Sequence, residues 1–212
     1  MSPSLFTPLE LRSVRLPNRV MVAPMGQSSS PGGVATDWHL VHLGGFAIGG
    51  AGLIMSEIVS VEPRGMISPY TLGIWTQEQV DALKPVTSFI KRQGSVPGIQ
   101  IGHAGRKGSK TRHWEGGQPI QPEDGGWKLR TPSGVPYHYE NETPPVTTEL
   151  TVDEIRALVD DFERAAENAL EAGFEVVELH GAHGYLLHEF LSPVTNRRQE
   201  FVQEVAVGTV EF

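Results

Sequence analysis

The sequence predicts an α/β fold, and within that class half of a (β/α)8 TIM barrel. Short apolar strands alternate with amphipathic helices, a pattern typical of parallel strands joined by crossover helices. Polar residues stand at the carboxyl ends of the strands, where such barrels have their active sites. An open doubly wound sheet fits the alternation as well, and only the polar strand ends favour the barrel. The 212 residues contain four strand–helix units, half the number that a closed barrel needs.

The first two units lie in the N-terminal part of the chain. An apolar run that ends at a proline predicts a buried strand over 19–24. Apolar and aromatic residues then recur at helical spacing over 37–48, where Thr36 or Asp37 can cap the start of the helix. A second buried strand is expected over 53–59, and its carboxyl half contains the polar residue Glu57.

The third and fourth units are predicted in the same way. A helix with one apolar face is expected over 77–93, followed by a strand over 96–101. A capping box at 151–154 opens a helix that ends at Gly173. A strand over 175–180 then leads into a short helix over 185–191.

A segment of about 48 residues, 102–150, shows no convincing helix or strand, and we expect it to be a loop on the active-site side. Loops of this length are uncommon and tend to be functional. Basic residues outnumber acidic ones over 103–130, and acidic residues dominate 140–175. The basic part is either an ordinary solvated loop or an anion-binding loop.

Composition and charge exclude several classes of function. The chain has no Cys, which rules out disulfides, thiolate metal sites and Cys nucleophiles, so redox chemistry requires a cofactor. The net charge of -8 disfavours nucleic acid or an anionic membrane as the main partner. The N-terminus does not resemble a signal peptide, and the most apolar stretch, 44–55, is shorter than the ~20 residues that span a bilayer. We therefore expect a cytoplasmic protein with no membrane span.

Three motifs follow the predicted strands: APM at 23–25, GIQIGHAGRK at 98–107 and ELHGAHGYLL at 178–187. As an ordered set they resemble the old yellow enzyme family of FMN-dependent ene-reductases, with the greatest similarity to the branch that includes xenobiotic reductase. The likeness extends over about 5–198. It implies a TIM barrel, non-covalently bound FMN, NAD(P)H as the hydride donor and a small electron-poor substrate such as an enone.

The last motif contains the candidate catalytic residues. His180 and His183 are two imidazoles three residues apart at a strand end, so both can point at one oxygen atom. Tyr185 adds a phenol that can donate a proton. The resemblance implies that the two histidines bind the carbonyl oxygen of an α,β-unsaturated substrate while hydride moves from flavin N5 to Cβ. Tyr185 would then protonate Cα.

The resemblance also implies a set of cofactor-binding residues. Backbone atoms of one loop and one strand would contact the flavin ring, an amide would bond its pyrimidine edge, and a histidine would lie near that edge. These residues are Pro24, Met25, Gly26, Ile58, Gln100 and His180.

The sequence also allows a different function for the histidine pair. The histidine pair can instead be the metal site of a hydrolase on a barrel, although no Glu of the His-Glu-x-x-His type accompanies it. Some residues near the motifs, His103, Arg106 and Lys107, receive no role. The remaining histidines are expected to be structural: His39, His42, His113, His138 and His188.

The sequence departs from the family pattern in three places. Gly26 stands where the family usually has a Cys or Thr that tunes the flavin, and Ser28 stands where the branch usually has a Tyr. After Arg198 the likeness stops, so we expect residues 1–198 to be the N-terminal half-barrel and 199–212 to be an unrelated tail. The absent half would hold the flavin phosphate. A truncated, inert fragment or pseudoenzyme is therefore an alternative, and exposed strand edges indicate a possible homo-oligomer.

Overall fold

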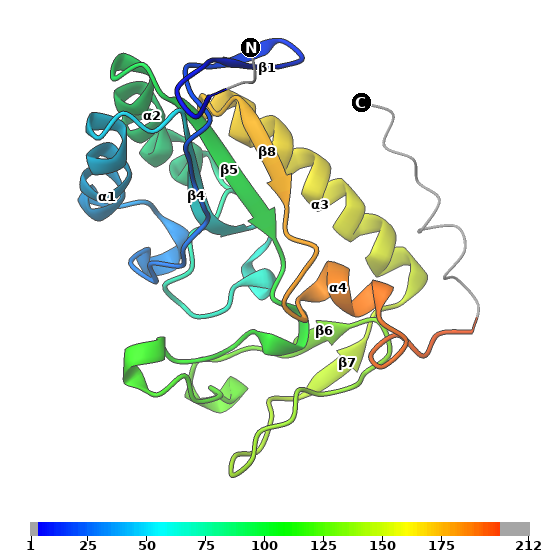
Figure 1. Ribbon diagram of the computed structural model, residues 1–212. Coiled ribbons are helices and arrows are strands. Elements are labelled where there is room, and N and C mark those ends of the chain that lie inside the picture. The colour runs from blue at the N-terminus through cyan, green and yellow to red at the C-terminus, as the bar shows by residue number, and fades with distance from the viewer. Residues whose placement is uncertain (1–3, 200–212) are drawn as a thin grey trace.

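Four parallel strands form the central sheet, in the order β3-β4-β5-β8. Their bounds are β3 Met21–Val22, β4 Leu53–Ser60, β5 Val96–Gly102 and β8 Val176–Leu179. The structure is a computed structural model that describes residues 4–199. Each strand pairs with the next of the four along the chain, which is the order of consecutive strands in a barrel (Figure 1).

Helices cover one face of this sheet. They are α1 Asp37–Ile48, α2 Gln77–Arg92 and α3 Val152–Glu171, and a short helix α4 Leu186–Leu191 follows β8. The main core lies between this face and the helices, and in it Ile99 and Ile101 of β5 pack with Leu83 of α2 and Ile155 of α3. The four predicted strand–helix units are therefore present.

The other face of the sheet is closed at its amino end by a hairpin that the sequence analysis did not predict. Strands β1 Leu9–Leu11 and β2 Val14–Leu16 pair antiparallel. Leu16 of the hairpin packs with Leu53 and Met55 of β4 and Val96 of β5. Strands of three residues are too short to show an alternating pattern, so the hairpin had no clear sequence signal.

The long segment 102–150 contains regular structure, so the prediction that it has no strand was wrong. Strands β6 Leu129–Thr131 and β7 Thr147–Glu149 pair in parallel, and three 3-10 turns lie between β5 and β6. This region lies beyond the carboxyl end of β5 (Figure 1). Again each strand has only three residues, and the paired positions are 18 residues apart in the chain, so no local pattern connects them.

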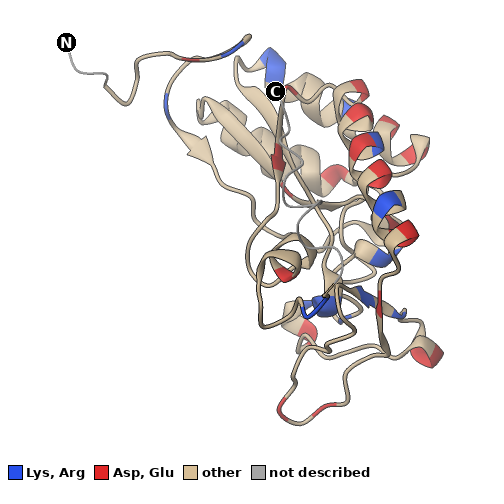
Figure 2. Ribbon diagram, turned by 90° about the vertical axis from the view of Figure 1, so that its right-hand side faces the viewer, with Lys and Arg blue, Asp and Glu red and all other residues tan. Residues whose placement is uncertain are grey.

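The remaining boundaries differ by a few residues from the sequence prediction. The first strand shrinks from 19–24 to Met21–Val22, and the last from 175–180 to Val176–Leu179. Figure 2 shows acidic residues recurring along the helices and a group of basic residues in the lower half of the view. Residues 200–212 of the predicted tail lie outside the described residues. Within 4–199, no helix has the length and apolar content to cross a membrane, and the cytoplasmic location stays a prediction.

Candidate functional site

The carboxyl ends of the four strands surround one cavity of about 420 Å³. Its wall combines residues from the loop after β3, from β4 and β5, and from the segment after β8. The structure thereby brings together seven of the eight residues that the sequence analysis selected, which are Pro24, Gly26, Ile58, Gln100, His180, His183 and Tyr185. The eighth, Met25, lies in the wall of a smaller neighbouring cavity and is 44% exposed.

The histidine pair is held by β5 and by the 3-10 turn after it. His180 continues the β8 ladder, because its backbone N–H donates to the carbonyl of Ile101 at 2.9 Å. His183 has φ 58, a left-handed conformation that few residues other than glycine adopt. The Lys107 ammonium donates to the His183 carbonyl at 2.7 Å and so stabilises this turn.

The two imidazoles face each other at short range. His180 Nε2 and His183 Nδ1 are 3.3 Å apart, so one oxygen atom can lie within hydrogen-bonding distance of both. His180 Nδ1 accepts the N–H of Ala182 at 3.3 Å, which places the proton of a neutral His180 on Nε2. Burial, and then the neighbouring His183, lowers the pKa of His180. His180 therefore offers a neutral N–H donor at neutral pH.

Tyr185 lies directly beside this pair. Its ring centre is 4.9 Å from that of His180, in an edge-to-face arrangement, and its backbone precedes α4. Burial raises the pKa of the Tyr185 phenol. The phenol therefore stays protonated at neutral pH, which is the state in which it can donate a proton.

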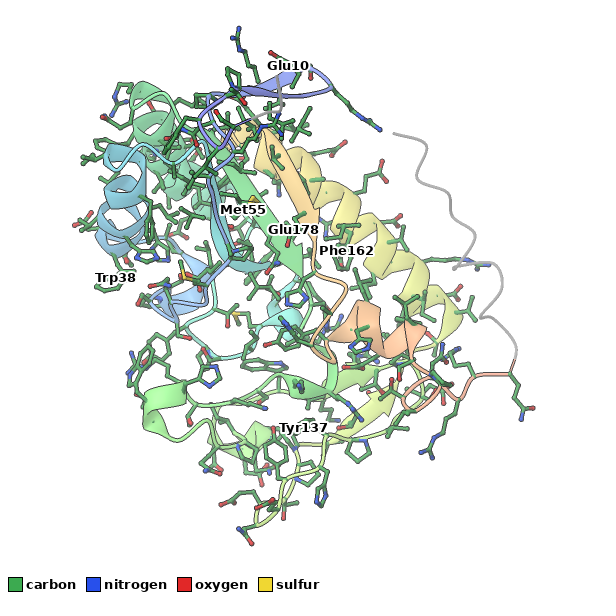
Figure 3. The ribbon with its side chains drawn as sticks, in the orientation of Figure 1. Glu10, Trp38, Met55, Tyr137, Phe162 and Glu178 are labelled. Atoms are coloured by element: carbon green, nitrogen blue, oxygen red, sulfur yellow. The ribbon has the colours of Figure 1, made fainter. Side chains whose placement is uncertain are left out.

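Gln100 has a side-chain partner that the sequence analysis did not identify. Its Nε2 donates to the carboxylate of Glu178, which is the residue opposite Gln100 on β8. Glu178 is labelled in Figure 3. This bond turns the amide so that its oxygen remains free as an acceptor. The signal was present, since Glu178 opens the ELHGAHGYLL motif, but only the parallel register places the two residues opposite each other.

Glu57 organises the loop that follows β3. Its buried carboxylate accepts the backbone N–H of Gln27 at 2.8 Å and lies 3.1 Å from His39 Nε2. His39 Nδ1 accepts the N–H of Thr36 at 2.9 Å, so a neutral His39 donates from Nε2 to Glu57. The sequence analysis noted Glu57 at a strand end but gave it no function. The contact ties β4, α1 and the 24–28 loop together at one point.

Gly26 leaves open space in the cavity wall. A Cβ built there meets no atom within 4 Å, and the residue is not in the left-handed region of φ. Position 26 can therefore hold a larger side chain without strain, such as the Cys or Thr that is usual in the old yellow enzyme family.

The other noted residues have these positions. His103 is buried, and its Nε2 lies 3.1 Å from the carboxylate of Glu62, which also accepts from Arg64. Burial would raise the pKa of Glu62, but the hydrogen bonds and charges of His103 and Arg64 outweigh burial and lower this pKa. His113, which we expected to be structural, lies in the cavity wall, and His42 lies in the smaller one. Within residues 4–199, no group of three or more His, Asp or Glu side chains is arranged to hold a metal ion.

A cavity of this kind can bind a flat ring system with polar edges. The acceptor oxygen of Gln100 suits an imide N–H, and the open space at Gly26 gives room beside the 24–28 loop. The donor set consists of amide, imidazole and phenol groups, which are suited to a flavin and an oxygen-bearing substrate. These residues fit FMN.

Comparisons with known proteins identify the family of the chain. Residues 4–201 match the NADH:flavin oxidoreductase / NADH oxidase family. An NADH:flavin oxidoreductase of Gibberella zeae is 43% identical over 202 residues, which are 94% of this chain and 48% of that protein. An NADPH dehydrogenase of Listeria monocytogenes is 41% identical over 198 residues, 92% of this chain and 53% of that protein. The chain thus spans about half the length of the curated relatives it matches.

Solved structures show the same relation. The old yellow enzyme homologue from Zymomonas mobilis superposes with a TM-score of 0.79 at 31% identity, over 94% of this chain and 54% of that one. Morphinone reductase in complex with tetrahydroNAD gives a TM-score of 0.78 at 34% identity, over 94% of this chain and 55% of that one. The fold is therefore that of half a TIM barrel, as predicted. The chain belongs to the NADH:flavin oxidoreductase / NADH oxidase family, the family of old yellow enzyme.

Proposed function

We propose that this chain contains the substrate-binding half of an FMN-dependent oxidoreductase that uses NAD(P)H to reduce the C=C bond of α,β-unsaturated carbonyl compounds. The observation that supports this function is the pair of nitrogens 3.3 Å apart, His180 Nε2 and His183 Nδ1, with Tyr185 beside them in the same cavity as Gln100. The proposed partners are FMN, the nicotinamide dinucleotide and a small enone. The hydrolase alternative is not supported, because the described residues supply no third metal ligand.

FMN, when bound, supplies the hydride chemistry. The protein residues do the rest. His180 and His183 both donate to the substrate carbonyl oxygen, which requires the proton of His183 to be on Nδ1. Two donors stabilise the negative charge that develops on this oxygen, and each typically contributes a few kcal/mol. Tyr185 holds its proton for transfer to the α carbon. Gln100, oriented by Glu178, accepts from the flavin imide, and Pro24, Met25, Gly26 and Ile58 contact the ring through their backbone.

A phenol-binding assay tests the histidine pair. A phenolate such as 4-nitrophenolate has a negatively charged oxygen, as the substrate has after hydride addition and before Cα is protonated, and its absorbance reports binding. We expect the double variant His180→Ala/His183→Ala to lose about tenfold or more in affinity, because both donors are removed. The matched control is His138→Ala, an exposed histidine in the segment between β6 and β7. Equal affinity in the wild type and the double variant would contradict the assignment.

An FMN titration tests the cofactor. Flavin fluorescence should be quenched as FMN enters the cavity. Gln100→Leu should weaken binding, because the amide acceptor is lost. Enone reduction with NADH or NADPH is then measured on the FMN-loaded protein. If FMN binds but the loaded protein does not reduce enones, the assignment of the flavin site stands and the proposed reaction is contradicted.

A further inference from the structure

Three basic side chains surround one tyrosine ring beyond the end of β5. Lys110 Nζ, Lys107 Nζ and Arg106 Cζ lie 4.5, 5.2 and 5.9 Å from the centre of the Tyr137 ring. The ring of Tyr139 lies 5.0 Å from that of Tyr137, and 5.1 Å from Lys110 Nζ. We call these five residues the Tyr137 cluster. Tyr137 is labelled in Figure 3, below the ends of the strands.

The positive charge of the Tyr137 cluster is not neutralised. Among residues 4–199, no ion pair links Arg106, Lys107 or Lys110 to a carboxylate, whereas the nearby Arg112 pairs with Glu115. The carboxylate that acts on Arg106 and Lys107 at longer range is Glu189. Burial raises the pKa of Glu189 to about 7, so at neutral pH it is only partly ionised.

Lys110 is the least compensated of the three. Its ammonium faces two tyrosine rings, which attract a cation but supply no full negative charge. Burial, and then the charge of Lys107, lowers the pKa of Lys110 to about 8. The Tyr139 hydroxyl oxygen is buried and has no hydrogen-bond partner among the described residues. An anion placed beside the Tyr137 ring would meet three cations.

The Tyr137 cluster adjoins the cavity. Lys107 Nζ is 5.8 Å from the centre of the Tyr185 ring and donates to the His183 carbonyl at 2.7 Å. Both of those residues lie in the cavity wall. A molecule with its reactive ring in the cavity and an anionic extension can therefore contact both places.

We propose that the Tyr137 cluster binds a phosphate group of the nicotinamide dinucleotide that donates the hydride. This inference rests on the proposed function. A phosphate has several charged oxygens, so it can accept from two lysines and an arginine at once, and lysine binds phosphate as a point charge. The group is either the pyrophosphate that NADH and NADPH share or the 2′-phosphate of NADPH alone. On this proposal the basic segment 103–130 is an anion-binding loop and not an ordinary solvated loop.

Calorimetric titration of the 212-residue chain at low ionic strength tests the site with inorganic pyrophosphate. We expect Lys110→Gln to weaken pyrophosphate binding at least fivefold, because one of three cations is removed. Lys110→Arg, which keeps the charge, should retain the affinity. Lys128→Gln is the matched control, since Lys128 is an exposed lysine in the same segment. Equal affinity in the wild type and Lys110→Gln, or no pyrophosphate binding at all, would overturn the proposal.

Titrations with NADH and NADPH identify the phosphate. An equal loss for both in Lys110→Gln assigns the pyrophosphate, and a loss for NADPH alone assigns the 2′-phosphate. Lys110-dependent binding of pyrophosphate with no such effect on either dinucleotide would overturn the assignment to the hydride donor. Pyrophosphate contains neither flavin nor enone, so this assay is independent of the phenol and FMN tests.

A second measurement avoids the variant in case Lys110→Gln does not fold. Pyrophosphate should protect Lys110 of the wild-type chain, and not Lys128, from acetylation at pH 8, as read by mass spectrometry. Equal acetylation of Lys110 with and without pyrophosphate would also overturn the proposal.

Discussion

Single carboxylates determine how this site is built. The buried Glu57 ties the 24–28 loop to α1, and the half-buried Glu178 orients the Gln100 amide. Each of these carboxylates accepts at least one hydrogen bond, as a charge removed from water requires. Glu189 differs, because its Oε1 accepts the backbone N–H of Arg106 at 2.9 Å while its buried Oε2 has no partner.

Glu189 therefore makes stability depend on pH. Its folded-state pKa is about 7, compared with 4.5 as the ordinary value. Below pH 4.5 the group is protonated in both states. Between these values the unfolded chain ionises while the folded protein keeps its proton, so stability falls as pH rises, by about 3 kcal/mol in total.

We expect Glu189→Gln to remove this loss, because a glutamine stays neutral and still accepts from Arg106. Urea unfolding at pH 5 and pH 8 measures the effect: the variant should gain about 2 to 3 kcal/mol over the wild type at pH 8 and much less at pH 5. Glu163→Gln, an exposed position on α3, is the control. The same difference between variant and wild type at both pH values would contradict the assignment.

At the scale of elements, a helix cap and an ion pair fix the position of the β6–β7 pair. Helix α3 begins with a reciprocal cap, in which the Glu154 carboxylate accepts the N–H of Thr151 at 2.8 Å and the Thr151 hydroxyl accepts the N–H of Glu154 at 3.3 Å. Glu154 also pairs with Arg130 of β6. The start of α3 therefore anchors the β6–β7 pair, and with it the segment that contains Tyr137.

Thr151→Ala should cost about 1 kcal/mol of stability, because one N–H at the helix start loses its acceptor. Thermal or urea unfolding measures this cost, and Thr143→Ala in the exposed loop before β7 is the control, expected within about 0.5 kcal/mol of the wild type. Equal stabilities of the two variants would show that this cap contributes nothing.

At the scale of the whole molecule, the edge strand β8 exposes apolar side chains to solvent. Val177 and Leu179 are opposite Ile99 and Ile101 in the parallel register. The two isoleucines are 0% and 1% exposed under α2 and α3, whereas Val177 and Leu179 are 38% and 49% exposed. An unpaired edge with apolar side chains promotes association.

We therefore expect the 212-residue chain to associate in solution, and Val177→Thr/Leu179→Thr to reduce the associated fraction several-fold while keeping residues suited to a strand. Light scattering after size exclusion measures the mass of each variant. Leu170→Thr, which removes an exposed leucine from α3, is the control. A wild-type chain that stays monomeric at high concentration would contradict this prediction.

The sequence by itself predicted the α/β class, the four strand–helix units and the family, because long periodic segments and ordered motifs are local signals. It also selected seven residues that now share one cavity, since strand ends in such folds meet at one edge. The tertiary structure alone revealed the β1–β2 hairpin, the β6–β7 pair, the Gln100–Glu178 bond and the Tyr137 cluster. Those features depend on contacts between residues far apart in the chain: Lys110 and Tyr137 are separated by 27 positions, and no periodic pattern connects them. Short strands and charged groups of this kind are specified by packing and register, which the order of residues does not display.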